Sequence, residues 1–334
     1  ADKSWWGPEF EFYIFSNVEY DTRTSSSFYK VEHVEEFYKK AYHAANPFDE
    51  YDDFRDQLTK LLIQQGVKVK YHHHEVGERG QQEIETYFAD LLTSGDNIVT
   101  TKYILFNFAE KNGLHITLMP KPMYQQAGNG LHLHLYLTKN GKNIFYKKGA
   151  YANMSEIGKN FIGGLLKHGP AVSAFTNPST NSYKRLVPGF EAPVNLAYSQ
   201  RNRSAAVRIP MYSTSPKAKR VEFRCPDPSA NPYLAFSAML MAGLDGIINR
   251  IDPGEPLDKD IYDMPPEELK NVPSTPGSLN EAIKALANDH DYLLKGDVFT
   301  EDVIETWIKY KVEKEIKPMA LQPHPFEFGM YYDV

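Results

Sequence analysis

Residues 9–12 read Glu9-Phe10-Glu11-Phe12, an alternation of acidic and aromatic side chains. Successive side chains of a β-strand point to opposite faces, so Glu9 and Glu11 share one face, and the phenylalanines share the other with Ile14. A strand face that meets solvent is ordinarily rich in Lys, Thr and Ser, whereas this face carries glutamates. The pattern therefore predicts a strand whose charged side encloses a site and whose apolar side is covered.

Three further stretches repeat this arrangement and set charged side chains against hydrocarbon. They are Val67–Glu75, Leu131–His134 and Arg220–Arg224. In the first of them Lys68 and Lys70 favour solvent, so we expect Glu75 on the opposite, inward face. Four such strands together predict an α+β fold, with a curved sheet around a metal-and-polyanion site and helices on its apolar side.

The remaining elements follow from hydrophobic spacing and from turn residues. We expect residues 17–50 to be irregular, residues 177–193 to form a loop, and a hairpin turn at 139–142. Helices are expected near residues 54–62, 96–112, 155–169, 231–247, from 278 onward and over 301–316. We read residues 1–250 as a sheet-and-helix catalytic domain and residues 251–334 as a helical C-terminal subdomain and tail of the same unit.

The bulk composition narrows the class of protein. The chain has 334 residues and a formal net charge of -6, which argues against a nucleic-acid partner. It contains one cysteine, Cys225, so no intrachain disulfide can form, and we expect a reducing, cytoplasmic location. No apolar window reaches the roughly 18 residues of a membrane span. The abrupt entry into a strand by Glu9 suggests a piece of a longer protein.

The acidic and imidazole groups of these strands are candidate metal ligands. They are Glu9, Glu11, Glu75, Glu83, His132 and Glu222. Carboxylate oxygens with one imidazole suit a hard divalent cation such as Mg²⁺ or Mn²⁺. Six ligands exceed what one catalytic ion with open positions needs, so two ions are the better count. The competing interpretation treats each residue as an exposed side chain of a half-buried strand.

A group of basic residues is the second candidate constellation. Its members are Arg185, Arg201, Arg203, Arg208, Lys217, Arg220 and Arg224. Arginine binds carboxylate and phosphate in a bidentate manner, so this group suits a nucleoside triphosphate together with an acidic substrate. The alternative is a solvated basic face.

Two local features complete the candidate chemistry. Glu191 lies in the Pro/Gly-rich loop 177–193, where it could act as a proton acceptor when the loop closes; the alternative is an ordinary exposed loop. The run His72-His73-His74 suggests zinc, but alternation splits it across both faces of a strand. We therefore treat these histidines as structural or nucleotide-adjacent.

From about Gly7 to Val334 the chain resembles the catalytic domain of bacterial and archaeal type I glutamine synthetase. The most specific match is the segment 177–193, NPSTNSYKRLVPGFEAP. Other matching segments are GPEFEF at 7–12, HHHE at 72–75, GQQE at 80–83, MPKP at 119–122, GLHLH at 130–134, RNRS at 201–204, RVEFR at 220–224 and DPSANPY at 227–233.

The resemblance implies a fold, an activity and an assembly. The fold would be the half-barrel, mainly antiparallel sheet of the glutamine synthetase and guanido kinase catalytic domains. The activity would be the ATP-dependent ligation of ammonia to L-glutamate through γ-glutamyl phosphate, with two Mg²⁺ or Mn²⁺ ions in each active site. The partners would be glutamate, ammonium, ATP and further copies of the chain in a double hexameric ring, with no nucleic acid and no membrane.

The resemblance also implies residue roles. One ion would bind Glu11, Glu75 and Glu83, and the other Glu9, His132 and Glu222. The ATP phosphates would contact His134, Arg208, Lys217 and Arg220. Glutamate or its acyl phosphate would contact Gly128, Arg185, Arg203 and Arg224. Glu191 would be the flap carboxylate that helps to take a proton from ammonium, with Arg185 and Arg203 beside it in catalysis.

The chain departs from the family pattern at several places. The family usually carries an N-terminal domain of roughly a hundred residues, which this chain lacks. Ala127 replaces an asparagine, Tyr136 a serine and Lys70 a glutamate, and Tyr262 lies where one subclass is adenylylated. These departures leave two alternatives open, a γ-glutamyl-amine or polyamine ligase of the same family and a non-catalytic assembly or regulatory subunit.

Overall fold

A ten-stranded sheet organises the protein, seen here in a computed structural model that describes residues 1–35, 41–190, 192–258 and 272–334. The strand order is β10-β11-β12-β8-β1-β5-β4, with β6 and β7 paired to β1 and β9 paired to β8. The pairings are antiparallel apart from the parallel pair β10–β11. The strands are β1 (Lys3–Phe15), β4 (Val69–His74), β5 (Gln81–Thr86), β6 (Ala89–Asp90), β7 (His115–Thr117), β8 (Leu131–Lys139), β9 (Lys142–Asn143), β10 (Asn195–Ser199), β11 (Ala205–Arg208) and β12 (Val221–Phe223).

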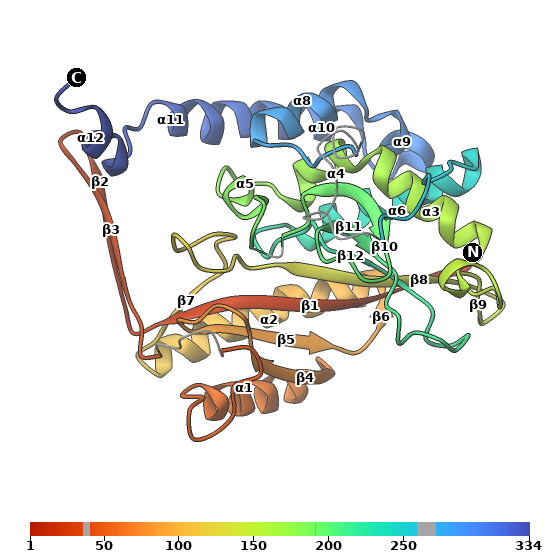
Figure 1. The fold of residues 1–334 in the computed structure, drawn as a ribbon, viewed down its shortest axis with the longest axis horizontal. Helices are drawn as coiled ribbons and strands as arrows, with labels where there is room; N and C mark the ends of the chain where they lie inside the picture. Colours follow the sequence, from red (N-terminus) through yellow and green to blue (C-terminus); the bar gives the residue numbers. More distant parts are fainter. Residues whose placement is uncertain (36–40, 191, 259–271) are drawn as a thin grey trace.

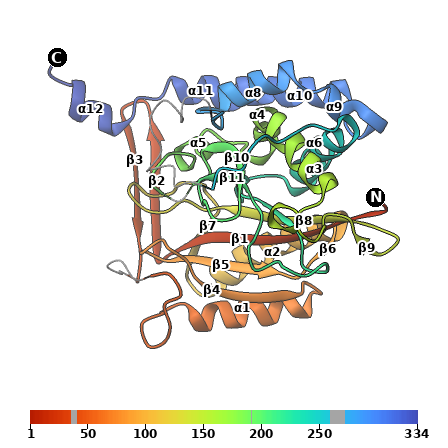
Figure 2. The same cartoon turned by 45° about the vertical axis from the view of Figure 1, so that its right-hand side comes forward.

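Helices pack around this sheet, and the expected α+β class is confirmed. In Figures 1 and 2, α1 and α2 lie near β4, β5 and β1, while α3, α4, α6, α8 and α10 gather on the side of β10 to β12. The helices are α1 (Asp52–Gln64), α2 (Leu91–Lys111), α3 (Glu156–Lys167), α4 (Gly169–Thr176), α5 (Ser182–Arg185), α6 (Pro232–Asn249), α8 (Leu279–Asn288), α9 (Asp291–Leu294), α10 (Glu301–Lys311), α11 (Lys317–Ala320) and α12 (Pro325–Tyr331). Shorter turns are the 3₁₀ segments η1 (Tyr151–Asn153) and η3 (Lys295–Asp297) and the π-helical turn η4 (Val312–Ile316).

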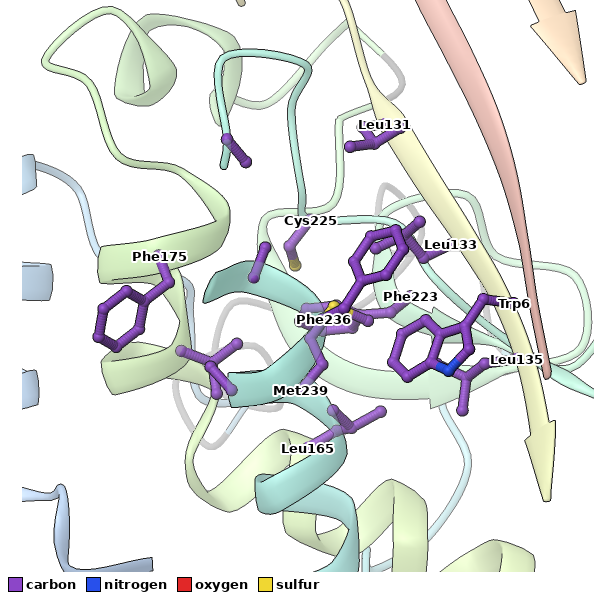
Figure 3. Packing of buried hydrophobic residues seen from close by; sticks show 14 of the residues in the cluster. Trp6, Leu131, Leu133, Leu135, Leu165, Phe175, Phe223, Cys225, Phe236 and Met239 are labelled. Atoms are coloured by element: carbon purple, nitrogen blue, oxygen red, sulfur yellow. The ribbon is translucent and has the colours of Figure 1, made fainter. Parts of the chain in front are cut away.

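The apolar face of the sheet forms the main core with α6. Trp6 of β1 stacks on Phe236 of α6, with ring centroids 4.8 Å apart and planes within 7°. Figure 3 shows these rings beside Leu133 and Leu135 of β8 and Phe223 of β12. All five side chains are fully buried. Burial of this size stabilises each large apolar side chain by roughly 1.5–3 kcal/mol, and it commits the opposite faces of β1, β8 and β12 to the polar side.

The segment that follows β1 differs from the irregular structure that was expected for residues 17–50. A two-stranded hairpin, β2 (Asn17–Arg23) and β3 (Ser26–Glu32), leaves the end of β1 and projects from the body in both views. Its side chains are largely exposed, including Tyr20 at 78% and Tyr29 at 58%. The alternation of Val18 and Tyr20 with Glu19 and Asp21 was present in the sequence, so this hairpin was overlooked although a period-two signal for it existed.

The expected helix over 155–169 also needs a correction at its end. The helix α3 begins after the N-cap Ser155, whose side chain accepts from the backbone N–H of Gly158, and it ends at Lys167. Gly169 and Pro170 then open a separate helix, α4. Proline fits the first turn of a helix because its missing N–H would be unpaired there, so the same dipeptide can mark a start as well as an end.

Lys68 and Lys70 are exposed, as expected, but the histidines farther along β4 are covered by protein. Arg55 of α1 is buried and donates to His72 Nδ1 at 3.1 Å. His74 is fully buried, with its Nε2 2.9 Å from Glu35 Oε2. The inward face predicted for Glu75 is right, and a helix and a loop as well as solvent lie behind the strand.

The C-terminal segment lies apart from the core. α11 and α12 extend to the tip of the β2–β3 hairpin in both views. Apolar side chains of this segment are exposed, among them Phe326 at 67% and Tyr332 at 81%. None of the helices in the described ranges combines the length and the apolar character that a membrane crossing requires.

Candidate active site

The candidate site lies on the polar face of the sheet, where β1 runs between β5 and β8. Glu9 sits opposite His132 of β8 and Glu85 of β5, and Glu11 sits opposite Glu83 of β5. Opposed residues on neighbouring strands share a face, so these side chains converge although they come from distant parts of the sequence. All five are buried. The alternation that opened the sequence analysis thus produces a continuous acidic strip across three strands.

One cluster on this strip joins Glu9, His132 and Glu222. Each residue offers one ligand atom, and these atoms lie within 4.8 Å of one another. His132 Nδ1 is 3.2 Å from Glu9 Oε2. Glu222 is fully buried, and its two oxygens accept hydrogen bonds from Arg208 Nε at 2.5 Å and Arg224 Nη1 at 2.8 Å. The three groups predicted to hold one cation therefore do meet.

Electrostatics keeps these carboxylates ionised. Burial by itself would raise the pKa of Glu222, but the neighbouring Arg224 and His134 outweigh it and lower that pKa. Burial likewise opposes ionisation of Glu9, and His134 and His132 bring its pKa well below the usual value. Buried carboxylates that stay charged at neutral pH are what a divalent cation requires as ligands.

The second cluster differs slightly from the predicted set. It joins Glu75 and Glu83 with His73, again with ligand atoms within 4.8 Å. Glu11 lines the same hollow, but its Oε2 accepts a hydrogen bond from the backbone N–H of Gly130 at 2.6 Å. Glu11 is thus near Glu75 and Glu83 without completing their cluster in this conformation.

The second cluster is short of positive charge. Burial is the main cause that raises the pKa of Glu75 well above its usual value, followed by repulsion from Glu11 and Glu83. Burial also raises the pKa of Glu83, together with repulsion from Glu9 and Glu11. Carboxylates forced together in this way are relieved by a bound proton or by a cation.

The clusters open onto one hollow of about 300 Å³. Most of the residues predicted from the sequence line it, namely Glu9, Glu11, Glu75, Glu83, Gly128, His132, Arg185, Arg203, Arg208 and Arg224. Glu222 lies behind this lining, where Arg208 and Arg224 bind it. Acids, an imidazole and arginines around one hollow suit an acidic or phosphorylated substrate held with cations.

Arg185 and Gly128 form one wall of the hollow. The buried guanidinium of Arg185 donates to the carbonyl oxygens of Cys225 at 2.7 Å and Arg224 at 3.1 Å. A Cβ on Gly128 would lie 2.5 Å from the carbonyl oxygen of Pro120 and 2.7 Å from Arg185 Cγ, so only glycine fits there. Arg185 is therefore fixed largely by backbone carbonyls in this conformation.

A second hollow, of about 850 Å³, lies toward the start of β1. Trp5, Tyr136 and Lys217 line it, and the Trp5 and Tyr136 rings stack with centroids 6.3 Å apart. Arg220 lies near the first hollow and donates from Nε to His134 Nδ1 at 3.3 Å. Its guanidinium also lies over the ring of Phe88, which contacts Tyr136 edge-on. A chain of basic and aromatic groups therefore leads from the carboxylate clusters to an aromatic slot.

Two predicted residues fall outside the described part of the chain. They are Glu191 and Tyr262. The neighbours of the first, Phe190 and Ala192, line the main hollow. Lys121 Nζ lies 3.7 Å from the centroid of the Phe190 ring. The loop that carries Glu191 thus borders the site on both sides of that residue.

The sequence reasoning passed over an aromatic wall of the hollow. Tyr42, His43, Tyr71, His73 and Tyr212 all line it. The rings of His43 and His73 stack with centroids 4.3 Å apart. Alternation along residues 67–75 already placed Tyr71 and His73 on the Glu75 face, so that signal was present. For Tyr42 and His43, in a segment without regular periodicity, no comparable signal exists.

Comparisons with known proteins agree with this geometry. The family profile described as "Glutamine synthetase, catalytic domain" matches residues 3–331. The glutamine synthetases of Frankia alni and Mycobacterium bovis are 50% and 49% identical; each match spans 100% of this chain and 74% of the relative. A solved structure of Plasmodium falciparum glutamine synthetase is similar with a TM-score of 0.92 at 31% identity, covering 99% of this chain and 75% of that one.

Proposed function

This chain belongs to the glutamine synthetase family, and we propose from that premise that its main hollow catalyses the ATP-dependent ligation of ammonia to L-glutamate. The activity is that of a carboxylate-amine ligase. The observation that carries the proposal is the meeting of Glu9, His132 and Glu222 in one cluster, beside Glu75 and Glu83 in another, within a hollow that arginines also line.

The donor set fits two divalent cations. We assign Glu11, Glu75 and Glu83 to one ion and Glu9, His132 and Glu222 to the other; Mg²⁺ and Mn²⁺ suit ligands that are mostly carboxylate oxygens. The fit is supported by the raised pKa values of Glu75 and Glu83, which burial causes first and repulsion from neighbouring glutamates second. When bound, such ions supply neutralisation of the phosphoryl charge.

The nucleotide would lie along the chain of basic and aromatic groups. Its base would lie in the second hollow against the rings of Trp5 and Tyr136, which offer an apolar surface. We assign the phosphates to His134, Arg208, Lys217 and Arg220. These residues would direct the γ-phosphoryl group toward the hollow that holds the carboxylate clusters.

Glutamate would occupy the other end of the hollow. Arg203 and Arg224 line it together with Gly128, and Arg185 backs it, so the substrate carboxylates would meet guanidinium groups. The side-chain carboxylate attacks the γ-phosphoryl group of ATP, ADP leaves, and ammonia then displaces phosphate from the γ-glutamyl phosphate. Phe190 and Ala192 border the hollow, where they would exclude water from this acyl phosphate. Glu191 stays our candidate for the proton acceptor.

The exposed C-terminal segment supports a homo-oligomeric assembly. Phe326, Phe328 and Tyr332 expose more than half of their surface on α12 and just beyond it, far from the core. Exposed apolar clusters of this kind commonly mark contacts with another chain. We propose that they contact further copies of this chain; the double hexameric ring expected from the family pattern stays a prediction that light scattering can test.

Phosphate release tests the function directly. With ATP and Mg²⁺, the protein should release ADP and phosphate only when glutamate and ammonium are both present, and glutamine should accumulate in equal amount. Release that ignores ammonium would indicate a plain ATPase and contradict the proposal. No turnover in any combination would favour the non-catalytic subunit.

A larger amine is the second candidate co-substrate, favoured by one observation. Ala127 lines the hollow with a small side chain, and the aromatic rings of Tyr42 and His73 lie on its wall. Aromatic faces bind organic ammonium ions through cation–π contacts. Faster glutamate-dependent phosphate release with ethylamine or putrescine than with ammonium would establish this variant of the reaction.

A further inference from the structure

His73 is the one imidazole of the run 72–74 that faces the main hollow. Its Nδ1 lies 3.0 Å from the carbonyl oxygen of His74. A carbonyl oxygen can only accept, so Nδ1 carries the hydrogen and donates. The ring is also held from the side, because it stacks on His43 with planes within 19°. Its orientation and its tautomer are therefore both fixed by neighbours.

The other nitrogen of this ring points at the carboxylate cluster. His73 Nε2 is 3.1 Å from Glu83 Oε1, and its ligand atom lies within 4.8 Å of those of Glu75 and Glu83. Because Nδ1 carries the hydrogen of the neutral ring, Nε2 has a free lone pair. This lone pair faces two carboxylates. Two negative groups and a lone pair repel one another unless a cation or a proton lies between them. A backbone carbonyl on the far nitrogen is also the usual support of a metal-bound histidine.

The neighbouring histidines do not share this arrangement. His72 lies on the opposite face, where Arg55 donates to its Nδ1 and Asp56 lies 3.0 Å from its Nε2. His74 is fully buried between Glu35 and the backbone oxygen of Glu75. Only His73 of these three offers a nitrogen to the hollow.

We propose that His73 is a further ligand of the cation that Glu75 and Glu83 bind, which gives that cation one imidazole nitrogen beside its carboxylate oxygens. The proposal deepens the proposed function and rests on its assignment of two cations. Glu9, His132 and Glu222 already form a cluster with one nitrogen, so each ion would have a mixed nitrogen and oxygen set. Imidazole favours Mn²⁺ and the later transition ions over Mg²⁺, so this chain should discriminate between these metals at both positions.

The test measures metal binding without turnover. Mn²⁺ binding to the full chain is followed by electron paramagnetic resonance in wild type, His73→Gln and the matched control His72→Gln. We expect two bound ions in wild type, a loss of roughly 10- to 100-fold in Mn²⁺ affinity at one position in His73→Gln, and a smaller loss of Mg²⁺ affinity. The His72→Gln protein should bind Mn²⁺ like wild type. Unchanged Mn²⁺ affinity in His73→Gln would overturn the proposal and leave His73 as an ion-pair partner of Glu83.

A second measurement needs no variant. In wild-type protein labelled with ¹⁵N-histidine, electron spin echo spectra should show nitrogen coupling to both bound Mn²⁺ ions, and coupling to one ion alone would contradict the role of His73. The outcome is separable from the proposed function: wild-type protein that releases phosphate with glutamate and ammonium, but shows one coupled ion, would retain the ligase and lose only this ligand.

Discussion

Two buried clusters of histidine and carboxylate in this protein have opposite characters. One is the junction of α4, α6 and α8, where His168 lies between Asp245 at 3.0 Å and Asp289 at 2.8 Å. Lys295 and Asn249 also bind Asp245, so its carboxylate is saturated by protein donors. The other is the main hollow, where burial and neighbouring carboxylates raise the pKa of Glu75 and Glu83.

The difference teaches how to separate a structural cluster from a site. Both clusters hold the same kinds of side chain at the same distances, and both are buried, so neither burial nor residue type distinguishes them. What differs is the supply of donors. At the junction every carboxylate named above has a protein donor as its partner, whereas Glu75 and Glu83 in the hollow are buried beside further carboxylates that repel them. The unbalanced cluster is the one that must bind something.

The largest expected effect is a loss of activity from a substitution in the main hollow. Glu222→Gln keeps the shape of the side chain but removes the charge that Arg208 and Arg224 bind. We expect kcat/KM for glutamine formation to fall by roughly 10²–10³-fold, the usual effect of losing one electrostatic group at a reacting centre. Phosphate-release kinetics measure it. Activity within threefold of wild type would remove Glu222 from the site.

His168→Ala examines the junction, where the expected loss is in stability. The substitution removes a buried partner shared by Asp245, which keeps Lys295 and Asn249, and by Asp289, whose side chain is 40% exposed. Losing hydrogen bonds at a buried polar group costs about 1–3 kcal/mol, which urea unfolding can measure. The kcat of the folded fraction should stay within twofold, since no residue of this cluster lines the hollow. A selective loss of kcat without destabilisation would erase the distinction between the clusters.

The pH dependence of stability should have opposite signs at the two clusters when a chelator removes divalent cations. Burial opposes ionisation of Asp245, but bonds from Lys295 and His168 lower its pKa from 3.8 to about 2. Its stabilisation is therefore complete above about pH 4 and is lost as the pH falls toward 2. Burial raises the pKa of Glu83, so its contribution worsens as the pH rises above 4.5.

Matched variants isolate these two slopes in urea unfolding at several pH values. The stability deficit of Asp245→Asn should shrink as the pH falls below 4. The stability of Glu83→Gln should rise relative to that of wild type as the pH rises above 4.5, and added Mg²⁺ should reverse this difference by stabilising the wild type more than the variant. Parallel profiles for both variants would show that the clusters do not differ in charge balance.

The smallest expected effect is a change in metal affinity when a lysine beside the hollow is replaced. Lys70 lies 2.7 Å from the buried Glu85 and is about one-third exposed. Lys70→Met removes this positive charge and should tighten Mn²⁺ binding roughly two- to fivefold, which is the scale of a partly exposed ion pair. Calorimetric titration can resolve such a change. Weaker binding in the variant would mean that Lys70 positions a ligand instead of competing with the ions.

Sequence alternation predicted the site well wherever a strand has one apolar face. Glu9, Glu11 and Glu83 were placed on the right side because Phe10, Phe12 and Ile84 had to enter the core. The same rule required no knowledge of which strands pair. Strand order and register then decided which acids meet, and the fold supplied that through the antiparallel pairing of β1 with β5 and β8.

The failures have physical reasons of the same kind. The β2–β3 hairpin has little buried surface, and the short alternation of Val18 and Tyr20 with Glu19 and Asp21 was overlooked within a segment that is otherwise irregular. Arg185 donates to the backbone carbonyls of residues 224–226, which are distant in the sequence. No local sequence pattern could predict that these two segments meet. His73 was missed because the split of residues 72–74 between two faces was used only to dismiss zinc, and the position of His73 on the Glu75 face was not followed up.

The position of Glu9 between two histidines links metal binding to nucleotide binding. Its Oε2 faces His132 and its Oε1 lies 2.6 Å from His134, so one short side chain spans the ion position and the nucleotide position. Any rotation that improves one contact changes the other. By thermodynamic reciprocity, occupation of the His132 side must alter affinity for the nucleotide by the same factor as the nucleotide alters affinity for the ion. The torsion angles of this one glutamate would therefore couple the two binding equilibria equally, whichever ligand binds first.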